Sequence, residues 1–545
     1  MKTLFLFPNW KTLLSALFIV LAFPPWNFSF LIWFALIPWF SALDKYKGER
    51  KALKKGLVLG VWQGVWLSFF MTLGGFYWVA YSLHEFGVLP WSLSIAALLL
   101  FSLGSQPQFI IFALLRVYLK KTINWEAGWK SLTLVSILAF AYTGLDWILP
   151  KIFLDTLGHS LYLSRYLNQS ADIGGAHLLT FIIYFSNETL YQFIKSRKKP
   201  FTPQFITGIL LFSLNFIYGY YRSHQIEKIM TAPHPTLQMG VIQANIGDFD
   251  KIAAENGVRG AAEKVLSTFF RLSDQALTLD PKPEVLVWPE TSYPSTFRTP
   301  QTLTEFQRDQ ELQNYVRARG VPLLFGGYDH SDSKDFNAFF FLSPHPLPAQ
   351  KTENDLQVYR KNILLLFGEY IPGYETFDFI KNNFPQVGNF GRGIGPEVLK
   401  IYSPQSGPIL VNPIICYEAL FSNFILDAVR KGSQIILNIT NDSWFGPYGE
   451  PDLHLALTVF RSLESRRPQV RSTNTGISAL ILPDGSMTNR SQINREEIVN
   501  MTVPILPSIQ TLMLKWGDWF GKFALILGLL GIFFAVFPYI QLSKP

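Results

Sequence analysis

Long apolar stretches alternate with short polar loops through the first 222 residues of the chain. A helix that crosses a bilayer needs about 20 predominantly apolar residues, and the pattern predicts seven such spans in this part. It predicts an eighth close to the C-terminus. The expected spans are roughly Trp10–Phe23, Phe28–Leu43, Leu57–Tyr81, Leu89–Tyr118, Leu132–Leu149, Gly175–Phe193, Phe205–Tyr221 and Trp519–Ile540.

Between residues 223 and 505 the apolar runs are short and alternate with segments of helical period. Strands that alternate with helices are typical of an α/β layered fold. We therefore expect a transmembrane bundle over 1–222, a globular domain over 223–505, and a last helix with a short tail over 506–545. The expected strands are Leu237–Ile246, Glu284–Trp288, Val321–Phe325, Ala338–Leu342, Ile409–Ile415, Gln434–Ile439 and Ile477–Leu482, and the expected helices are Ala261–Leu279, Gln301–Arg317, Ala419–Arg430 and His454–Arg466.

The net charge of +8 belongs to the apolar parts of the chain. Residues 223–505 hold 25 Lys and Arg against 30 Asp and Glu, and the remainder holds 22 against 9. Basic loops beside membrane helices produce this distribution, whereas a nucleic-acid groove would place the basic residues on the globular domain. We therefore expect no nucleic-acid partner.

Lysine and arginine gather in alternate loops of the apolar part. Six of them lie between Lys45 and Lys55, and the loops after the first and third spans hold none. The positive-inside rule then predicts that both termini are cytoplasmic and that residues 223–505 face outward. We expect the first span to be retained, because no small-residue cleavage site follows it.

Cys416 is the only cysteine of the chain, and it follows the apolar run 409–415. A strand that ends on a nucleophile and turns at once into a helix projects that side chain from the edge of a sheet. A lone cysteine is more often a small buried apolar residue, and that alternative stays open at this point. One thiol excludes an intramolecular disulfide and is unusual in an oxidising compartment.

Two more ionisable groups follow apolar runs, where a charge is costly unless it is paired or used. They are Glu290 and Lys361, and Glu369 lies eight residues beyond the lysine. A carboxylate base, an amine and a thiol are sufficient for acyl transfer. Singly, each has a structural interpretation: Glu290 as a carboxylate at a helix N-terminus, Lys361 as a partner of Asp355, and Glu369 as a turn cap.

Together these stretches resemble the nitrilase (carbon–nitrogen hydrolase) superfamily. Combined with the expected spans and the outward domain, the resemblance narrows to the apolipoprotein N-acyltransferase family. The stretches that carry it are Trp288-Pro289-Glu290, Tyr359-Arg360-Lys361-Asn362, Phe367-Gly368-Glu369 and Cys416-Tyr417-Glu418, supported by 169–175, 243–246, 441–446 and 467–477. The chain departs from the family at Leu366, where proline is common, and in Gly247–Gly257, which lacks the usual tryptophan.

The resemblance implies a nitrilase-like αββα sandwich joined to a bundle of about eight transmembrane helices. It implies that Cys416 is the nucleophile, Glu290 the general base and Lys361 the electrostatic stabiliser. Supporting roles fall to Glu369, Tyr417 and Glu418.

The implied partners are a phospholipid acyl donor and a diacylated lipoprotein acceptor, and no cofactor or metal is expected. The implied location is the bacterial inner membrane, with the catalytic domain on the periplasmic side. Two alternatives stay open at this point. One is a membrane-tethered amidase that uses water in place of the amine, and the other is an inactive homologue that binds lipid or lipoprotein.

Overall fold

The chain separates into two units, which are described in turn. The helical unit comprises 1–225, 448–460 and 515–545, and the α/β unit comprises 226–447 and 461–514. Phe367, part of one predicted motif, lies outside the described residues. The computed structural model describes residues 7–45, 53–122, 128–196, 202–255, 257–258, 260–300, 302–332, 334–345, 355–366, 368–374, 376, 379, 390–403 and 407–541.

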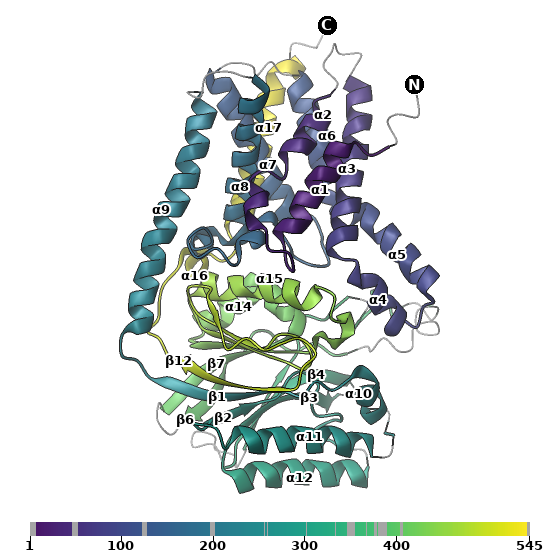
Figure 1. Ribbon diagram of the computed structural model, residues 1–545, viewed down its shortest axis with the longest axis vertical. Helices are drawn as coiled ribbons and strands as arrows, with labels where there is room; N and C mark the ends of the chain where they lie inside the picture. The colour runs from purple at the N-terminus through teal and green to yellow at the C-terminus, as the bar shows by residue number, and fades with distance from the viewer. Residues whose placement is uncertain are drawn as a thin grey trace. The chain divides into compact units, whose positions relative to one another are not determined.

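The helical unit follows the predicted apolar stretches, with three of them broken. The second expected span is a short 3₁₀ helix followed by α2, the third is divided into α3 and α4 at Phe76-Tyr77, and the fourth is divided into α5 and α6 at Ser105-Gln106. Figure 1 shows these helices running largely alongside one another. The elements are α1 (Trp10–Ala22), η2 (Ser29–Trp33), α2 (Ile37–Leu43), α3 (Leu53–Gly75), α4 (Trp78–Glu85), α5 (Trp91–Gly104), α6 (Pro107–Thr122), α7 (Gly128–Ile148), η4 (Leu157–Leu161), α8 (Ala171–Ser196), α9 (Pro203–Thr231) and α17 (Phe520–Gln541).

Among the described residues, four helical stretches are long and apolar enough to cross a membrane. They are Leu53–Gly75, Trp91–Lys120, Gly128–Ile148 and Phe520–Phe537. α1 and the η2–α2 segment are apolar but shorter. α8 and α9 are long, but polar and charged side chains along them lower their hydropathy. The structure therefore supports a membrane part with fewer clear spans than the eight expected.

Buried charges tie α2, α6 and α8 together. Arg116 of α6 is fully buried, with Nη1 2.6 Å from Asp44 Oδ1 and Nη2 3.0 Å from Glu188 Oε2. Lys120 and Lys195 add contacts of 2.7 Å to Glu188 and 2.6 Å to Asp44. A charge in an apolar bundle is tolerated when it is paired in this way, so this cluster has a structural explanation.

α7 and α17 approach each other closely because glycines face the contact. A Cβ on Gly144 would lie 2.4 Å from the Cα of Leu525, and one on Gly528 would lie 2.8 Å from the Cα of Ala141. Small residues at such contacts let helix backbones pack in an apolar environment. In α8, Gly175 adopts φ +64° inside a kink, a conformation that glycine adopts without a steric penalty.

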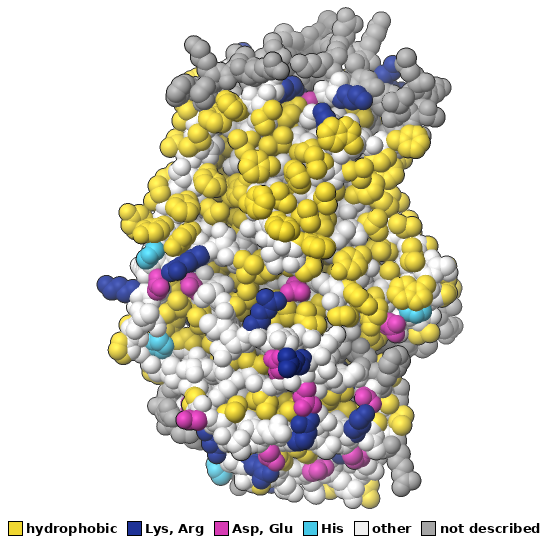
Figure 2. Space-filling view, in the orientation of Figure 1, with side chains coloured by type: hydrophobic (Ala, Val, Ile, Leu, Met, Phe, Trp, Pro, Cys, Tyr) yellow, Lys and Arg dark blue, Asp and Glu magenta, His cyan; other side chains and the backbone are white. Residues whose placement is uncertain are grey.

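The surface of the helical unit is mostly apolar, as the yellow band of Figure 2 shows. On α17, Leu529, Phe533 and Phe534 are all more than half exposed. Contiguous apolar surface of this extent is rare on soluble monomers and indicates contact with lipid or protein. On the α/β unit the visible charged side chains are of both signs.

The α/β unit contains two six-stranded sheets. The first has the order β12-β1-β2-β3-β4-β5, and the second has the order β11-β10-β9-β8-β7-β6. Parallel pairs lie at the centre of each sheet, β1–β2–β3 in one and β7–β8–β9 in the other. The strands are β1 (Thr236–Gln243), β2 (Val285–Val287), β3 (Leu323–Ser331), β4 (Lys334–Leu342), β5 (Leu356–Arg360), β6 (Leu399–Ser403), β7 (Gly407–Ile415), β8 (Ile435–Thr440), β9 (Gln469–Thr473), β10 (Ala479–Ile481), β11 (Met487–Thr488) and β12 (Glu497–Pro504).

The two sheets pack face to face, and helices cover their outer faces (Figure 1). Side chains such as Val285 and Phe339 of the first sheet share one buried cluster with Val411 and Ile435 of the second. A second cluster joins α11 and α12 to the first sheet, and a third joins α14 to the second. This is the predicted αββα sandwich. The helices that lie wholly in this unit are α10 (Asp248–Glu255), α11 (Ala261–Ala276), α12 (Leu303–Arg319) and α14 (Ser422–Arg430), whereas α15 (Glu450–Ser465) and α16 (Leu512–Trp516) belong partly to each unit.

All seven expected strands and all four expected helices of this unit are present, with shifted limits. The pattern did not predict β5, β6, β9, β11, β12 or α10. Several of these are edge or polar strands, in which apolar residues do not dominate. They form because a neighbouring strand supplies their hydrogen bonds, as β1 does along the whole length of β12.

Candidate active site

Three strand ends of the α/β unit position the predicted site residues. Glu290 comes three residues after β2, Lys361 follows β5 directly, and Cys416 follows β7 directly. All three side chains are at least nine-tenths buried. Strands of two different sheets therefore supply one set of ionisable groups.

Three donors hold the Glu290 carboxylate. Oε1 accepts from Asn337 Nδ2 at 2.7 Å and from Lys361 Nζ at 3.2 Å. Oε2 accepts from the backbone N–H of Asn441 at 2.9 Å. Multiple charge-assisted bonds restrict the carboxylate to one orientation, which a general base requires.

Lys361 lies between two carboxylates. Its Nζ is 2.7 Å from Glu369 Oε1 and 3.2 Å from Glu290 Oε1. Burial alone would lower the pKa of this lysine, but Glu290, Glu369 and Cys416 together raise it above its usual value. Lys361 is therefore a permanent cation of the site, suited to stabilising negative charge and not to accepting a proton.

Cys416 adopts a left-handed backbone conformation, with φ +50°, at the point where β7 meets the 3₁₀ helix η5 (Cys416–Leu420). Non-glycine residues in this region cost about 1 kcal/mol or more and cluster at functional sites. Burial and the charge of Glu290 raise the pKa of the thiol, and Lys361 opposes them. The resting group is therefore a thiol that needs a base before it can attack.

Glu418 joins the Lys361 loop to the Cys416 turn. Oε2 accepts from Tyr359 OH at 2.7 Å and from the N–H of Ile415 at 2.8 Å. Oε1 accepts from the N–H of Asn362 at 2.6 Å and of Ile363 at 3.2 Å. Burial raises the pKa of Glu418 to about 7, although these hydrogen bonds oppose the shift. The geometry suits a positioning role.

Glu369 and Tyr417 differ in how closely they join this network. Glu369 accepts from Lys361 and from Asn337 Nδ2, the latter at 3.0 Å, and its Oε2 accepts from the N–H of Leu365 at 2.8 Å. The Tyr417 ring packs edge-on against Phe421 at 5.2 Å, and burial raises the pKa of Tyr417 to about 12. Glu369 thus contacts the predicted site directly, whereas Tyr417 contributes packing beside Cys416.

Sequence reasoning assigned no role to Asn337. Its Nδ2 bridges Glu290 and Glu369, and its backbone carbonyl accepts from the N–H of Lys361 at 2.8 Å. A signal was available, because Asn337 lies between Phe336 and Ala338 as a polar residue inside the apolar part of β4. Buried amides of this kind are kept when they satisfy specific partners.

The stretch Gly247–Gly257 contains α10, and residue 256 lies outside the described residues. Lys251 of this helix is buried and donates a short hydrogen bond to Thr291 Oγ1, one residue beyond Glu290. Glu255 accepts from Tyr328 OH at 2.9 Å. The segment without the family's tryptophan therefore contacts the residue that follows the predicted base.

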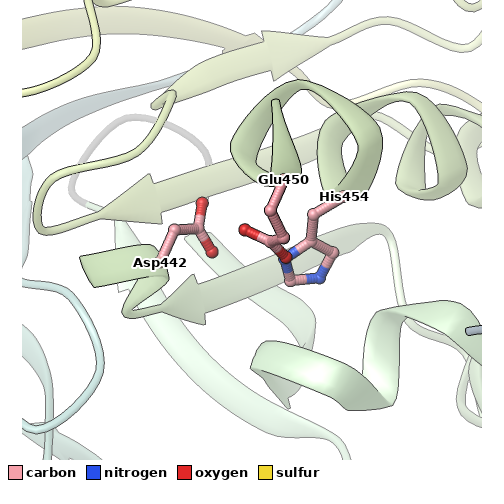
Figure 3. A group of neighbouring side chains, drawn as sticks. All are labelled: Asp442, Glu450 and His454. Atoms are coloured by element: carbon pink, nitrogen blue, oxygen red, sulfur yellow. The ribbon is translucent and has the colours of Figure 1, made fainter. Parts of the chain in front are cut away.

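Asp442, Glu450 and His454 are side chains of types that ligate metal ions (Figure 3). Asp442 is paired with the buried Arg471, whose Nη2 lies 2.7 Å from Oδ2. Glu450 and His454 lie one turn apart on α15, with 3.7 Å between Oε1 and Nδ1. The arginine gives the Asp442 carboxylate a structural partner of opposite charge.

Comparisons with known proteins cover nearly the whole chain. The family model for the apolipoprotein N-acyltransferase N-terminal domain matches residues 15–189, and the carbon-nitrogen hydrolase model matches residues 239–505. The apolipoprotein N-acyltransferase of Bdellovibrio bacteriovorus is 34% identical over 91% of this chain and 88% of its own. That of Geobacter metallireducens is 28% identical over 93% and 91%. Among solved structures, an amidase mutant from Nesterenkonia sp. AN1 is 14% identical, with a TM-score of 0.36, over 50% of this chain and 94% of that chain.

Proposed function

This chain belongs to the apolipoprotein N-acyltransferase family, and on that premise we propose that it moves an acyl chain from a membrane phospholipid to a lipoprotein. The acyl group would be carried as a thioester on Cys416. The acceptor would be the α-amine of a diacylglyceryl-cysteine lipoprotein. The observation that carries the proposal is the Glu290–Lys361 pair at the strand ends that also present Cys416.

In the first half-reaction the thiol proton passes to Glu290 as the sulfur attacks the ester carbonyl of the phospholipid. Lys361 stabilises the oxyanion that forms. The carbon–oxygen bond then breaks, and Glu290 returns the proton to the leaving lysophospholipid. The raised pKa of the thiol makes the proton transfer necessary, because little thiolate exists at neutral pH.

In the second half-reaction the lipoprotein amine attacks the thioester. Glu290 accepts a proton from the amine, the carbon–sulfur bond breaks, and the sulfur leaves as the thiolate, which recovers the proton. The product is an amide, the third acyl chain of the lipoprotein. Two covalent steps with a shared enzyme intermediate predict ping-pong kinetics.

Both proposed substrates are lipids, so the apolar helices have a function in keeping the enzyme at the membrane. Each methylene transferred out of an apolar phase costs about 0.8 kcal/mol, so acyl chains stay in the membrane while the reacting groups meet the thiol. We propose eight spans, a bundle over 1–222, a periplasmic catalytic domain over 223–505, and a final span with a cytoplasmic tail over 506–545. Both termini would be cytoplasmic, in the inner membrane.

The test uses the purified full-length protein with labelled phospholipid and a diacylated lipopeptide. Wild type should form the amide and show an acyl adduct on Cys416 by mass spectrometry when the lipopeptide is omitted. Cys416→Ser should lose both signals, whereas Lys264→Gln, an exposed change on α11, should keep both. Full transfer by Cys416→Ser would refute the nucleophile assignment. Free fatty acid as the main product would instead support the amidase alternative.

A further inference from the structure

A groove of about 710 Å³ opens in the α/β unit at a place with no part in the proposed chemistry. The start of β7 and the segment after β12 form two of its walls. Three cationic side chains line it, and no carboxylate does so among the described lining residues. Its polar lining includes Lys400, Arg430, Gln434, Arg467, Ser508 and Gln510.

Arg467 is a buried cation that is bound only to neutral acceptors. Its side chain is 6% exposed, and Nε donates to the carbonyl of Ser433 at 3.1 Å. Nη1 donates to the carbonyls of Ser465 and Arg466 at 3.3 Å, and Nη2 donates to Ser508 Oγ at 3.0 Å. A guanidinium has five N–H groups, so one on Nη2 stays available among the described contacts.

Among the described residues, no carboxylate forms an ion pair with Arg467. Burial lowers the pKa of this arginine. Arg430 differs, because Asp427 forms a short ion pair with it. Buried charges are normally paired, so an unbalanced arginine beside a groove favours an anionic occupant.

This groove is separate from the candidate active site. Leu410 lines the groove near the start of β7, and Cys416 follows the other end of the same strand. A strand rises about 3.3 Å per residue, so the six steps between them span roughly 20 Å. Gln434, just before β8, places the groove at the same N-terminal edge of the parallel strands.

The chain itself links the groove to the membrane part. Leu514 lines the groove, and Phe520, where the apolar helix α17 begins, follows six residues later. Six residues reach at most about 20 Å, whatever the arrangement of the two units. Trp516 and Trp519 lie in this short connection, and tryptophan is enriched at the membrane–water interface.

We propose that this groove is a phosphate-binding site, occupied by the headgroup phosphate of an anionic lipid. Arginine recognises phosphate through paired N–H donors, and lysine adds a point charge. Arg467 would bind the phosphate through its available N–H, with Lys400 and the Ser508 hydroxyl beside it. The site would hold a lipid next to α17 without taking part in acyl transfer.

The test is native mass spectrometry of the full-length protein in detergent with three ligands. Phosphatidylglycerol carries phosphate and chains, diacylglycerol carries only the chains, and glycerol 1-phosphate carries only the phosphate. Lys400→Gln and Arg467→Lys should each weaken phosphatidylglycerol retention by about tenfold, the scale of one lost hydrogen bond to a charged group. Lys264→Gln is the matched control and should bind as wild type does.

Each outcome decides the proposal. Tighter binding of phosphatidylglycerol than of glycerol 1-phosphate supports the lipid source, and equal binding supports a phosphate site filled from solution. Diacylglycerol binding as tightly as phosphatidylglycerol, or both groove variants binding as Lys264→Gln does, overturns it. Lys400→Gln decides the result if Arg467→Lys fails to fold. Cys416→Ser should keep this binding, so failure of the acyltransferase proposal is distinguishable from failure of this one.

Discussion

The Glu290 carboxylate and the Lys361 ammonium are adjacent buried charges, and each is held by more than its partner. Asn337 and the Asn441 N–H bind the carboxylate, and Glu369 binds the ammonium. Paired and hydrogen-bonded charges of this kind are costly to break, because removal of one partner strands the other. At the residue scale, we therefore expect substitutions of the residues that hold the proposed triad to lower activity nearly as much as substitutions of the triad itself.

Asn337 tests this directly. Asn337→Ala removes the donor shared by Glu290 and Glu369, and kcat/KM for amide formation should fall about 10- to 100-fold, the range for hydrogen bonds to charged groups. Asn337→Asp places a third carboxylate there, so its loss should be larger and should ease at lower pH. The control is Gln275→Ala, which truncates an exposed amide on α11. Wild-type kcat/KM in Asn337→Ala at every pH would contradict the prediction.

Glu418 should make stability depend on pH. Burial raises its pKa in the folded protein to about 7, above the usual value of 4.5, so the folded state binds the proton more tightly than the unfolded state. The stabilisation is complete below pH 4.5 and is lost as pH rises through 7. We expect the unfolding temperature in detergent to fall between pH 5 and pH 8.

The matched variants are Glu418→Gln and the exposed Glu496→Gln. Glu418→Gln should show a smaller fall over that pH range, since the titrating group is gone, and Glu496→Gln should behave as wild type does. Across this pH range, titration of Glu418 lowers the free energy of unfolding by about 3 kcal/mol at most. Equal slopes in wild type and Glu418→Gln would show that another group is responsible.

At the scale of elements, function depends on where strands end and on how closely helices approach. Glu290, Lys361 and Cys416 are placed by the ends of β2, β5 and β7. In the helical unit, α7 and α17 meet through glycines, with no room for a side chain at Gly144. The strand ends and the close helix contact both depend on the course of the backbone, so they cannot be recognised from side-chain chemistry alone.

Gly144→Ala should therefore force α7 away from α17. The added Cβ would meet backbone atoms at 2.4 Å, a contact that must be relieved by helix movement, and overpacking of this kind costs about 1–3 kcal/mol. The expected result is a lower unfolding temperature and less protein in the membrane fraction. Gly104→Ala is the control, because open space surrounds that position. Equal stability of the two variants would show that the contact does not constrain the helices.

At the scale of the whole molecule, two parts of different surface chemistry share one chain. The helical unit exposes apolar side chains, and the α/β unit carries a mixture of charges (Figure 2). The basic excess lies outside residues 223–505. This distribution fits a chain with one part in contact with a membrane and one part in water.

The proposed orientation predicts opposite results for two reporters. Green fluorescent protein fused after Pro545 should fluoresce, because that end is expected in the cytoplasm. Alkaline phosphatase fused after Ala232 should be active, because it folds only after export and that point is expected in the periplasm. A fusion of each reporter at the other position is the control. A silent phosphatase at Ala232 would mean that an even number of spans precedes it.

Short-range pattern was enough to predict an α/β layered fold and the apolar stretches, and the motifs around Glu290, Lys361 and Cys416 carried the resemblance that implied the αββα sandwich. Each of these depends on residues close together in the chain, such as the apolar run that ends at Cys416. The break in the fourth stretch falls at Gly104-Ser105-Gln106-Pro107, an interruption that the sequence itself shows. The breaks in the second and third stretches were not predicted, because apolarity alone does not mark them.

The role of Asn337 depended on partners 47 and 32 residues away. The pairing register of β3, β4 and β5 brings this side chain to the carboxylates, and register is a property of the assembled sheet. The contact of Lys251 with Thr291 and the surroundings of Arg467 likewise depend on residues that are distant in the sequence. The sequence alone identifies the candidate reacting groups, because each is marked by the residues next to it, whereas the partners that hold them are determined only when distant strands come together.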